Sequence, residues 1–134
     1  MNPSPQKEDY LLLFRDTAWD KDLSPTQVQQ VLTDWYAWLD RLMQEGKCTS
    51  AHPLLNQGKV VSGKHGANVV DGPFAESKEA IGGYFYLQVA DEAEAIQIAQ
   101  QCPALPHGCV VEVRPISPRC SMSLRATPSV ETND

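Results

Sequence analysis

Apolar residues recur at steps of three and four between residues 25 and 45, which predicts a long amphipathic helix. Ser24 suits the N-cap, Pro25 the first helical position, and Gln27 the third position of a capping box. Gly46 suits the residue just past the helix end. The apolar face consists of Val28, Val31, Leu32, Trp35, Leu39, Leu42 and Met43.

Three other segments have the pattern of sheet strands. Residues 10–14 form a continuous apolar run, which is typical of a strand buried on both faces. Residues 84–89 are rich in aromatic and aliphatic side chains, and residues 110–116 form the last predicted strand. Between the last two we expect a second helix, capped by Asp91 and ended by Pro103, with Glu94 at its third position. Its apolar stripe is Ala95, Ile98, Ala99 and Cys102.

The middle of the chain carries weaker signals. Residues 59–62 and 67–70 resemble two short strands, and the glycine-containing stretch 63–66 suits a hairpin turn between them. Residues 75–83 suggest one or two helical turns ended by glycines. We therefore predict one α+β domain with a ferredoxin-like βαββαβ order, an inserted β-hairpin and both helices on one face of the sheet.

The other face of that sheet needs cover. On the last strand Val111 and Val113 point one way, whereas Glu112 and Arg114 point the other way together with Val110 and Ile116. A face of mixed polar and apolar side chains is unlike simple solvent surface. We expect a second protomer to lie on it in a two-fold homodimer, leaving a cavity lined by polar groups.

Composition narrows the function. The chain has 134 residues and a formal net charge of −6, which disfavours nucleic acid and anionic membranes as partners. It has no apolar run near the roughly 20 residues that span a bilayer, and its start does not resemble a secretory signal. We expect a cytoplasmic protein with a domain over 9–116, a flexible N-terminal extension over 1–8 and a flexible C-terminal tail over 117–134.

Cysteine and histidine spacing gives no metal signature. The four cysteines form no CxxC pair, and the three histidines show no HxxxH or HExxH spacing. Free, mostly buried thiols are the expected state in a reducing compartment. The chain also lacks glycine-rich phosphate loops and the GxSxG motif, so we expect no cofactor.

Two stretches resemble a known family. The run DGPFAESKEAIGGYFYLQV at 71–89 and the run HGCVVEVRPI at 107–116 are similar to the DGPF branch of the YCII-related (YciI-like) family. Trp19 and the Leu-Ser-Pro helix start at 23–25 add to the resemblance, which spans about 9–116. It implies a dimeric α+β barrel shared with muconolactone-isomerase-like and antibiotic-monooxygenase-like proteins. It implies no established reaction, although some members are linked to extracytoplasmic-function sigma factors, and a His–Asp pair is proposed as catalytic in the YciI branch.

Asp71 and His107 are the candidate catalytic residues. Asp71 ends a predicted strand, where a carboxylate in a partly dry cavity can exchange protons. His107 precedes the last strand and titrates near neutral pH, so the two side chains can form an acid–base pair if the strand ends meet. The alternatives are a turn aspartate and a loop histidine, and His52 is a weaker candidate for the same role.

The candidate ligand contacts fall into three groups. Gly72 and Pro73 form a turn that a ligand can approach closely, with a plain turn as the alternative. Arg15 and Arg114 can each fork onto a ligand carboxylate, or else pair with an acid such as Glu112. The remaining candidates are Phe74 as a core anchor, Glu76 near the cavity mouth or across the dimer, and Tyr84 and Tyr86 as stacking surfaces.

Three hypotheses for function follow. The first is a homodimer that binds a small molecule, with a possible link to sigma-factor regulation. The second is a cofactor-independent isomerase, lyase or monooxygenase-like enzyme that uses the Asp71–His107 pair. The third is an interaction subunit without a ligand. A closed pocket that holds the pair within hydrogen-bond reach would favour the enzyme.

Overall fold

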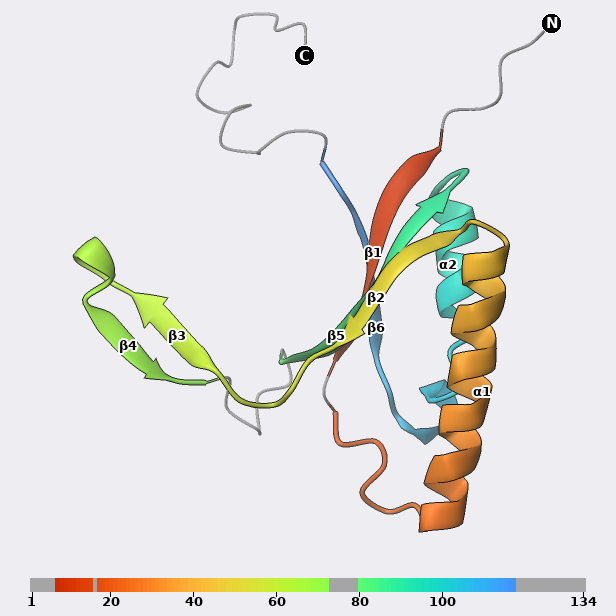
Figure 1. The fold of residues 1–134 in the computed structure, drawn as a ribbon, viewed down its shortest axis with the longest axis horizontal. Helices are drawn as coiled ribbons and strands as arrows, with labels where there is room; N and C mark the ends of the chain where they lie inside the picture. The colour runs from red at the N-terminus through yellow and green to blue at the C-terminus, as the bar shows by residue number, and fades with distance from the viewer. Residues whose placement is uncertain (1–6, 16, 73–79, 118–134) are drawn as a thin grey trace, which may run out of the picture.

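The computed structural model describes residues 7–15, 17–72 and 80–117. In the described residues, one antiparallel sheet is covered on one face by two helices, and a separate two-stranded hairpin extends from the sheet's lower end (Figure 1). The elements in chain order are β1 (Glu8–Arg15), α1 (Pro25–Gln44), β2 (Cys48–Pro53), β3 (Lys59–Ser62), η1 (Lys64–Gly66), β4 (Asn68–Asp71), β5 (Ile81–Val89), α2 (Glu92–Ala99), η2 (Leu105–His107) and β6 (Val111–Pro115).

The main sheet has the strand order β2-β5-β1-β6, with antiparallel neighbours throughout. Leaving out the hairpin, this is the order 2-3-1-4 expected of a βαββαβ chain folded in the ferredoxin-like way. The central pair is in continuous register from Glu8 opposite Val89 to Phe14 opposite Gly83. The predicted α+β, ferredoxin-like class is confirmed at this level.

The helix α1 forms as its sequence predicts. Ser24 accepts a hydrogen bond from the Gln27 backbone and the Gln27 side chain accepts one from the Ser24 backbone, so the capping box is complete. Gly46 follows the helix with a left-handed φ of 74° that residues with a Cβ rarely adopt. Its buried residues, Val31, Trp38 and Leu42, pack against the sheet.

The structure differs from the predicted elements in three places. Strand β2 lies in CTSAHP, which has no apolar alternation and was not predicted as a strand. Strand β5 begins at Ile81, so the glycines expected to end a helical turn lie within the strand. A Cβ on Gly83 would lie 3.1 Å from the His52 carbonyl oxygen, so glycine lets β2 approach closely there. Helix α2 ends at Ala99, before Cys102 and Pro103.

The hairpin stands clear of the body (Figure 1). We call residues 59–71, which comprise β3, η1 and β4, the arm. The predicted hairpin is confirmed, with Val60 opposite Val70 and Val61 opposite Val69, and every residue of β3 and β4 is exposed. At its base the Gly72 backbone N–H donates to the Gly58 carbonyl at 3.0 Å.

The two faces of the main sheet differ. Tyr10, Leu12 and Phe14 of β1 are buried beneath the helices. The alternate residues of β1 and of its neighbours form what we call the open face, which no described helix covers. Its members are Asp9, Leu11, Leu13, Arg15, Ser50, His52, Tyr84, Tyr86, Gln88, Glu112 and Arg114. Among the described residues, neither helix has the length and apolar character to cross a membrane.

Candidate functional site

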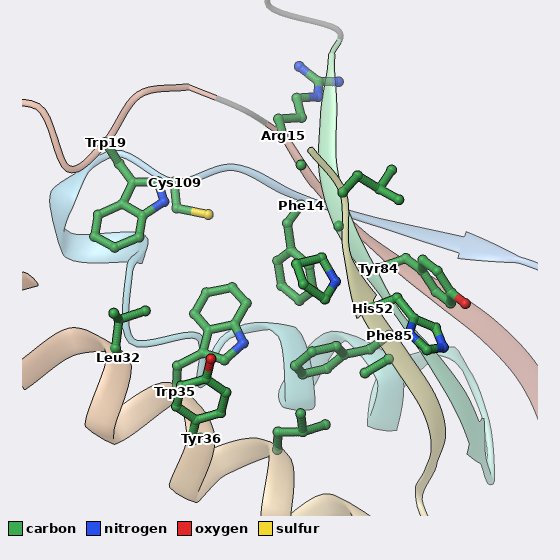
Figure 2. A pocket seen from close by; sticks show the side chains of 16 residues that line it. Phe14, Arg15, Trp19, Leu32, Trp35, Tyr36, His52, Tyr84, Phe85 and Cys109 are labelled. Carbon is green, nitrogen blue, oxygen red and sulfur yellow. The ribbon is translucent and has the colours of Figure 1, made fainter. Parts of the chain in front are cut away.

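A cavity of about 330 Å³ lies where α1 meets the ends of β1, β2 and β5 (Figure 2). That volume falls in the range of small-molecule sites. Its described lining residues are Phe14, Arg15, Trp19, Leu32, Trp35, Tyr36, Leu39, Ala51, His52, Pro53, Leu54, Gly82, Gly83, Tyr84, Phe85 and Cys109. Aromatic and aliphatic side chains predominate, and a few polar groups stand among them.

Packed aromatic rings form the inner wall. The Phe14 ring centroid lies 4.7 Å from that of Trp35 and 4.8 Å from that of Phe85. Trp38 packs behind them, with its ring centroid 5.4 Å from Trp35 in an edge arrangement. The buried indole N–H of Trp38 has no hydrogen-bond partner among the residues that the structure describes. Because these rings hold one another in edge and tilted contacts, the wall is a rigid apolar surface.

The loop after β1 places Trp19 on the opposite side of the cavity. The Thr17 hydroxyl donates to the Gly108 carbonyl at 3.1 Å, which ties this loop to the turn before β6. Ala18 has a φ of 54°, an uncommon left-handed conformation for a residue with a Cβ. The ring of His107 lies nearly parallel to Trp19, with centroids 6.3 Å apart. His107 therefore supports a cavity-lining side chain and is not itself among the described lining residues.

Three polar side chains stand at the edge of the cavity (Figure 2). The rings of His52 and Tyr84, on neighbouring strands, have centroids 5.7 Å apart. The Arg15 Nε atom lies 3.0 Å from the Glu112 carboxylate. The Arg114 Nη1 atom lies 3.6 Å from the other oxygen of the same carboxylate. Both arginines therefore pair with Glu112, which is the alternative to their predicted role as ligand contacts.

Tyr86 takes part in a second network on the open face. Its hydroxyl donates to the Asp9 carboxylate at 2.8 Å, and this hydrogen bond raises the pKa of Tyr86 because it stabilises the protonated phenol. The Gln88 amide also donates to Asp9, at 3.4 Å. Tyr86 is not among the described cavity-lining residues. Tyr84 therefore lines the cavity, whereas Tyr86 is hydrogen-bonded to Asp9 on the open face.

Asp71 and His107 lie in different structural units. Asp71 is at the base of the arm, where its exposed carboxylate pairs with Lys59 on the neighbouring strand. His107 is in η2 beside Trp19. In the described residues no hydrogen bond joins the two side chains, so their role as an acid–base pair stays a prediction without a contact to support it.

The motif around Asp71 is only partly described. Gly72 is buried and closes the base of the arm, and a Cβ there would lie 2.5 Å from a methyl group of Val60. A side chain at this position would therefore force Val60 to move. Pro73, Phe74 and Glu76, which were predicted as ligand contacts, lie outside the described residues.

Two buried thiols contact each other, and one of them, Cys109, lines the cavity. The thiols of Cys102 and Cys109 are hydrogen-bonded to each other, which lowers the pKa of Cys102 and raises that of Cys109. Burial also disfavours ionisation of both groups. The Cys109 sulfur faces the cavity (Figure 2). Across the described ranges, no three His, Cys, Asp or Glu side chains gather in a way that could hold a metal ion.

The comparison with protein families settles the family. The model of the YCII-related domain matches residues 9–118, which include every element of the fold described above apart from Glu8, the first residue of β1. The chain belongs to the YCII-related family. It is also 30% identical over 105 residues to R00369, an uncharacterized protein of Rhizobium meliloti (strain 1021), across 75% of this chain and 82% of that protein.

Sequence reasoning missed several cavity residues of this YCII-related chain. Tyr36 and Leu39 lie on α1, and the structure places them with Pro53 at the end of β2 and with Leu54, which follows it. Because β2 has no strand pattern, nothing in the sequence placed this segment opposite α1. The usable sequence signal for Tyr36 was a large aromatic residue beside the predicted apolar face of the helix, and the structure leaves its side chain 66% exposed.

Proposed function

We propose that this YCII-related protein is a homodimer that binds a small apolar or aromatic molecule in the cavity beside α1. The observation that carries the proposal is the cavity itself. It has the size of a ligand site, a wall of packed aromatic rings and few polar groups at its edge. Flat apolar ligands fit such a wall by stacking and by displacing poorly bound water.

The polar edge suggests an anionic group on the ligand. His52 and Tyr84 supply hydrogen-bond donors, and Arg15 also lines the cavity, with its positive charge paired to the Glu112 carboxylate. An aromatic carboxylate would stack on Trp35 and place its charge at this edge. The predicted enzyme alternative has no comparable support, because its proposed acid and base lie in different units.

Tryptophan emission tests ligand binding directly, because Trp19 and Trp35 line the cavity. We expect 1-naphthoate to change the emission saturably, and neutral naphthalene to bind more weakly. Tyr36→Ala and His52→Ala, both at exposed positions, should each weaken naphthoate binding by about tenfold. His65→Ala, at an exposed position on the arm, is the matched control and should leave binding unchanged. Emission that is unaltered by either probe at millimolar concentration would refute the ligand site.

The homodimer part of the proposal rests on the open face. Leu11, Leu13 and Tyr84 are partly exposed there beside Arg114 and Asp9. A two-fold partner buries these apolar groups and brings charges of both signs opposite one another. The link to an extracytoplasmic-function sigma factor rests on the family resemblance alone, and co-purification with such a factor is its test.

Light scattering after size exclusion tests the dimer. We expect twice the 14.8 kDa chain mass for the wild type, and a shift toward the monomer for Leu13→Asp and for Arg114→Glu. Ile96→Asp makes a comparable change on the exposed side of α2 and should remain dimeric. A wild-type mass of one chain at high micromolar concentration would overturn this part of the proposal.

A further inference from the structure

The arm presents apolar side chains on both of its faces. Val60 pairs with Val70 and Val61 pairs with Val69, and successive pairs point to opposite faces of the ribbon. The four valines are between 46% and 61% exposed. An isolated two-stranded hairpin is marginally stable in water, and one with valines on both faces exposes the surface that sheets usually bury.

The position of the arm points to what covers it. In Figure 1 the helices lie on one side of the main sheet and the arm extends on the other side, which is the side of the open face. A molecule that covers the open face therefore also lies within reach of the arm. The proposed two-fold dimer places a second copy of this chain in that space.

Charge favours the same partner. The arm contains Lys59, Lys64 and Asp71, which give it a formal charge of +1. The whole chain carries −6, so the rest of the chain carries −7. Lys59 pairs with Asp71 at the base, and among the described residues no ion pair involves Lys64 near the tip. A basic tip on an otherwise acidic chain is complementary to a second copy of the body.

We propose that the arm of each protomer embraces the second copy in the dimer, packing its valines against the partner's body. The arm is then part of a two-fold, reciprocal interface. This inference rests on the proposed homodimer and adds that the arm is a segment of each protomer that stabilises it.

The arm can be removed without disturbing its base. The Gly72 N–H already donates to the Gly58 carbonyl at 3.0 Å, so a variant that lacks residues 59–71 can join Gly58 to Gly72. We expect this deletion to raise the dimer dissociation constant by at least about tenfold, because it removes four apolar anchors. The double variant Val61→Lys/Val69→Lys should have a similar effect with the arm still present. Gln29→Lys/Thr33→Lys adds the same charge at exposed positions on α1 and should leave the constant unchanged.

Isotope-filtered NOEs test the contact itself. In dimers mixed from labelled and unlabelled chains, methyl groups of the four arm valines should show NOEs to the unlabelled protomer, whereas Val28 on α1 should show none. A dimer without such NOEs, whose dissociation constant also ignores the arm deletion, refutes the embrace and leaves the homodimer standing. A wild type that is monomeric at all concentrations refutes both.

Discussion

The two faces of the main sheet use the same strands for different purposes. On β1, Leu12 is fully buried beneath the helices, whereas its neighbour Leu13 is only partly covered on the open face. The covered face excludes water and makes the core, so it sets stability. The open face mixes leucines and tyrosines with ion pairs, a composition that suits contact with another molecule.

The difference is one of context and not of residue type. Tyr84 and Phe85 are adjacent aromatic residues, yet Phe85 is 3% exposed in the core and Tyr84 lies at the edge of the cavity on the opposite face. Alternation along a strand sends neighbours to different environments. Substitutions at adjacent positions should therefore separate folding from association.

The largest expected effect compares Leu12→Ala with Leu13→Ala. Leu12 is 0% exposed, and its truncation leaves a cavity in the packed core, which costs about 3 kcal/mol. We expect Leu13→Ala to cost about 1 kcal/mol or less at dilutions where the protein is monomeric. Urea denaturation at two protein concentrations measures both values. If the two variants lose the same free energy of unfolding at low protein concentration, the two faces do not differ as described.

The next largest effect on stability is expected at the start of α1, one of the two helices on the covered face. Ser24→Ala removes one half of the capping box of α1 and should lower the free energy of unfolding by about 1 kcal/mol. The nearby exposed Thr26→Ala makes a similar change without losing a cap, and should have little effect. If the two variants lose equal stability in thermal or urea denaturation, the cap does not fix the start of α1.

A pH-dependent contribution to the same layer comes from Glu94. Its carboxylate accepts the Ala90 N–H at 2.8 Å and pairs with Lys47 at 3.0 Å, and these contacts lower its pKa from 4.5. The lowered pKa stabilises the fold above pH 4.5, and that stabilisation is lost as pH falls through the folded-state value.

We therefore expect Glu94→Gln to cost a few tenths of a kcal/mol at neutral pH, since the pair is partly exposed. The difference from wild type should disappear toward pH 2. Urea denaturation across this pH range measures it, with Glu92→Gln as the control. A difference that persists at pH 2 would assign the effect to shape and not to charge.

The smallest effect belongs to the open face. Asp9→Asn removes the carboxylate that raises the pKa of Tyr86, so the Tyr86 pKa should fall toward its ordinary value of 10.0. NMR titration of ring-labelled tyrosine measures this shift. Glu8→Gln is the matched control, because Glu8 accepts from Tyr10, whose pKa is raised first by burial and then by this hydrogen bond. An unchanged Tyr86 pKa in Asp9→Asn would show that the hydrogen bond is absent in solution.

The sequence by itself determined the elements with strong local signals. The capping box of α1, the strand β1 and the hairpin of the arm form where their local patterns predict. Burial is less complete than predicted, because Leu11 and Leu13 of β1 are only partly buried and Met43 of the α1 stripe is exposed. The α+β class and the family followed from the same order and from the motifs. Each of these features depends on side chains close together in the chain, so a local pattern is enough to reveal it.

Only the tertiary structure decided the rest. Strand β2 has no pattern of its own and exists because β5 offers it an edge, at which Gly83 allows close approach. The cavity gathers side chains from α1, β1, β2 and β5, which no sequence period connects. Asp71 and His107 are separated by the fold, since the arm carries one away while η2 holds the other beside Trp19. These residues are far apart in the sequence, so their contacts depend on how the whole chain packs and not on any local pattern.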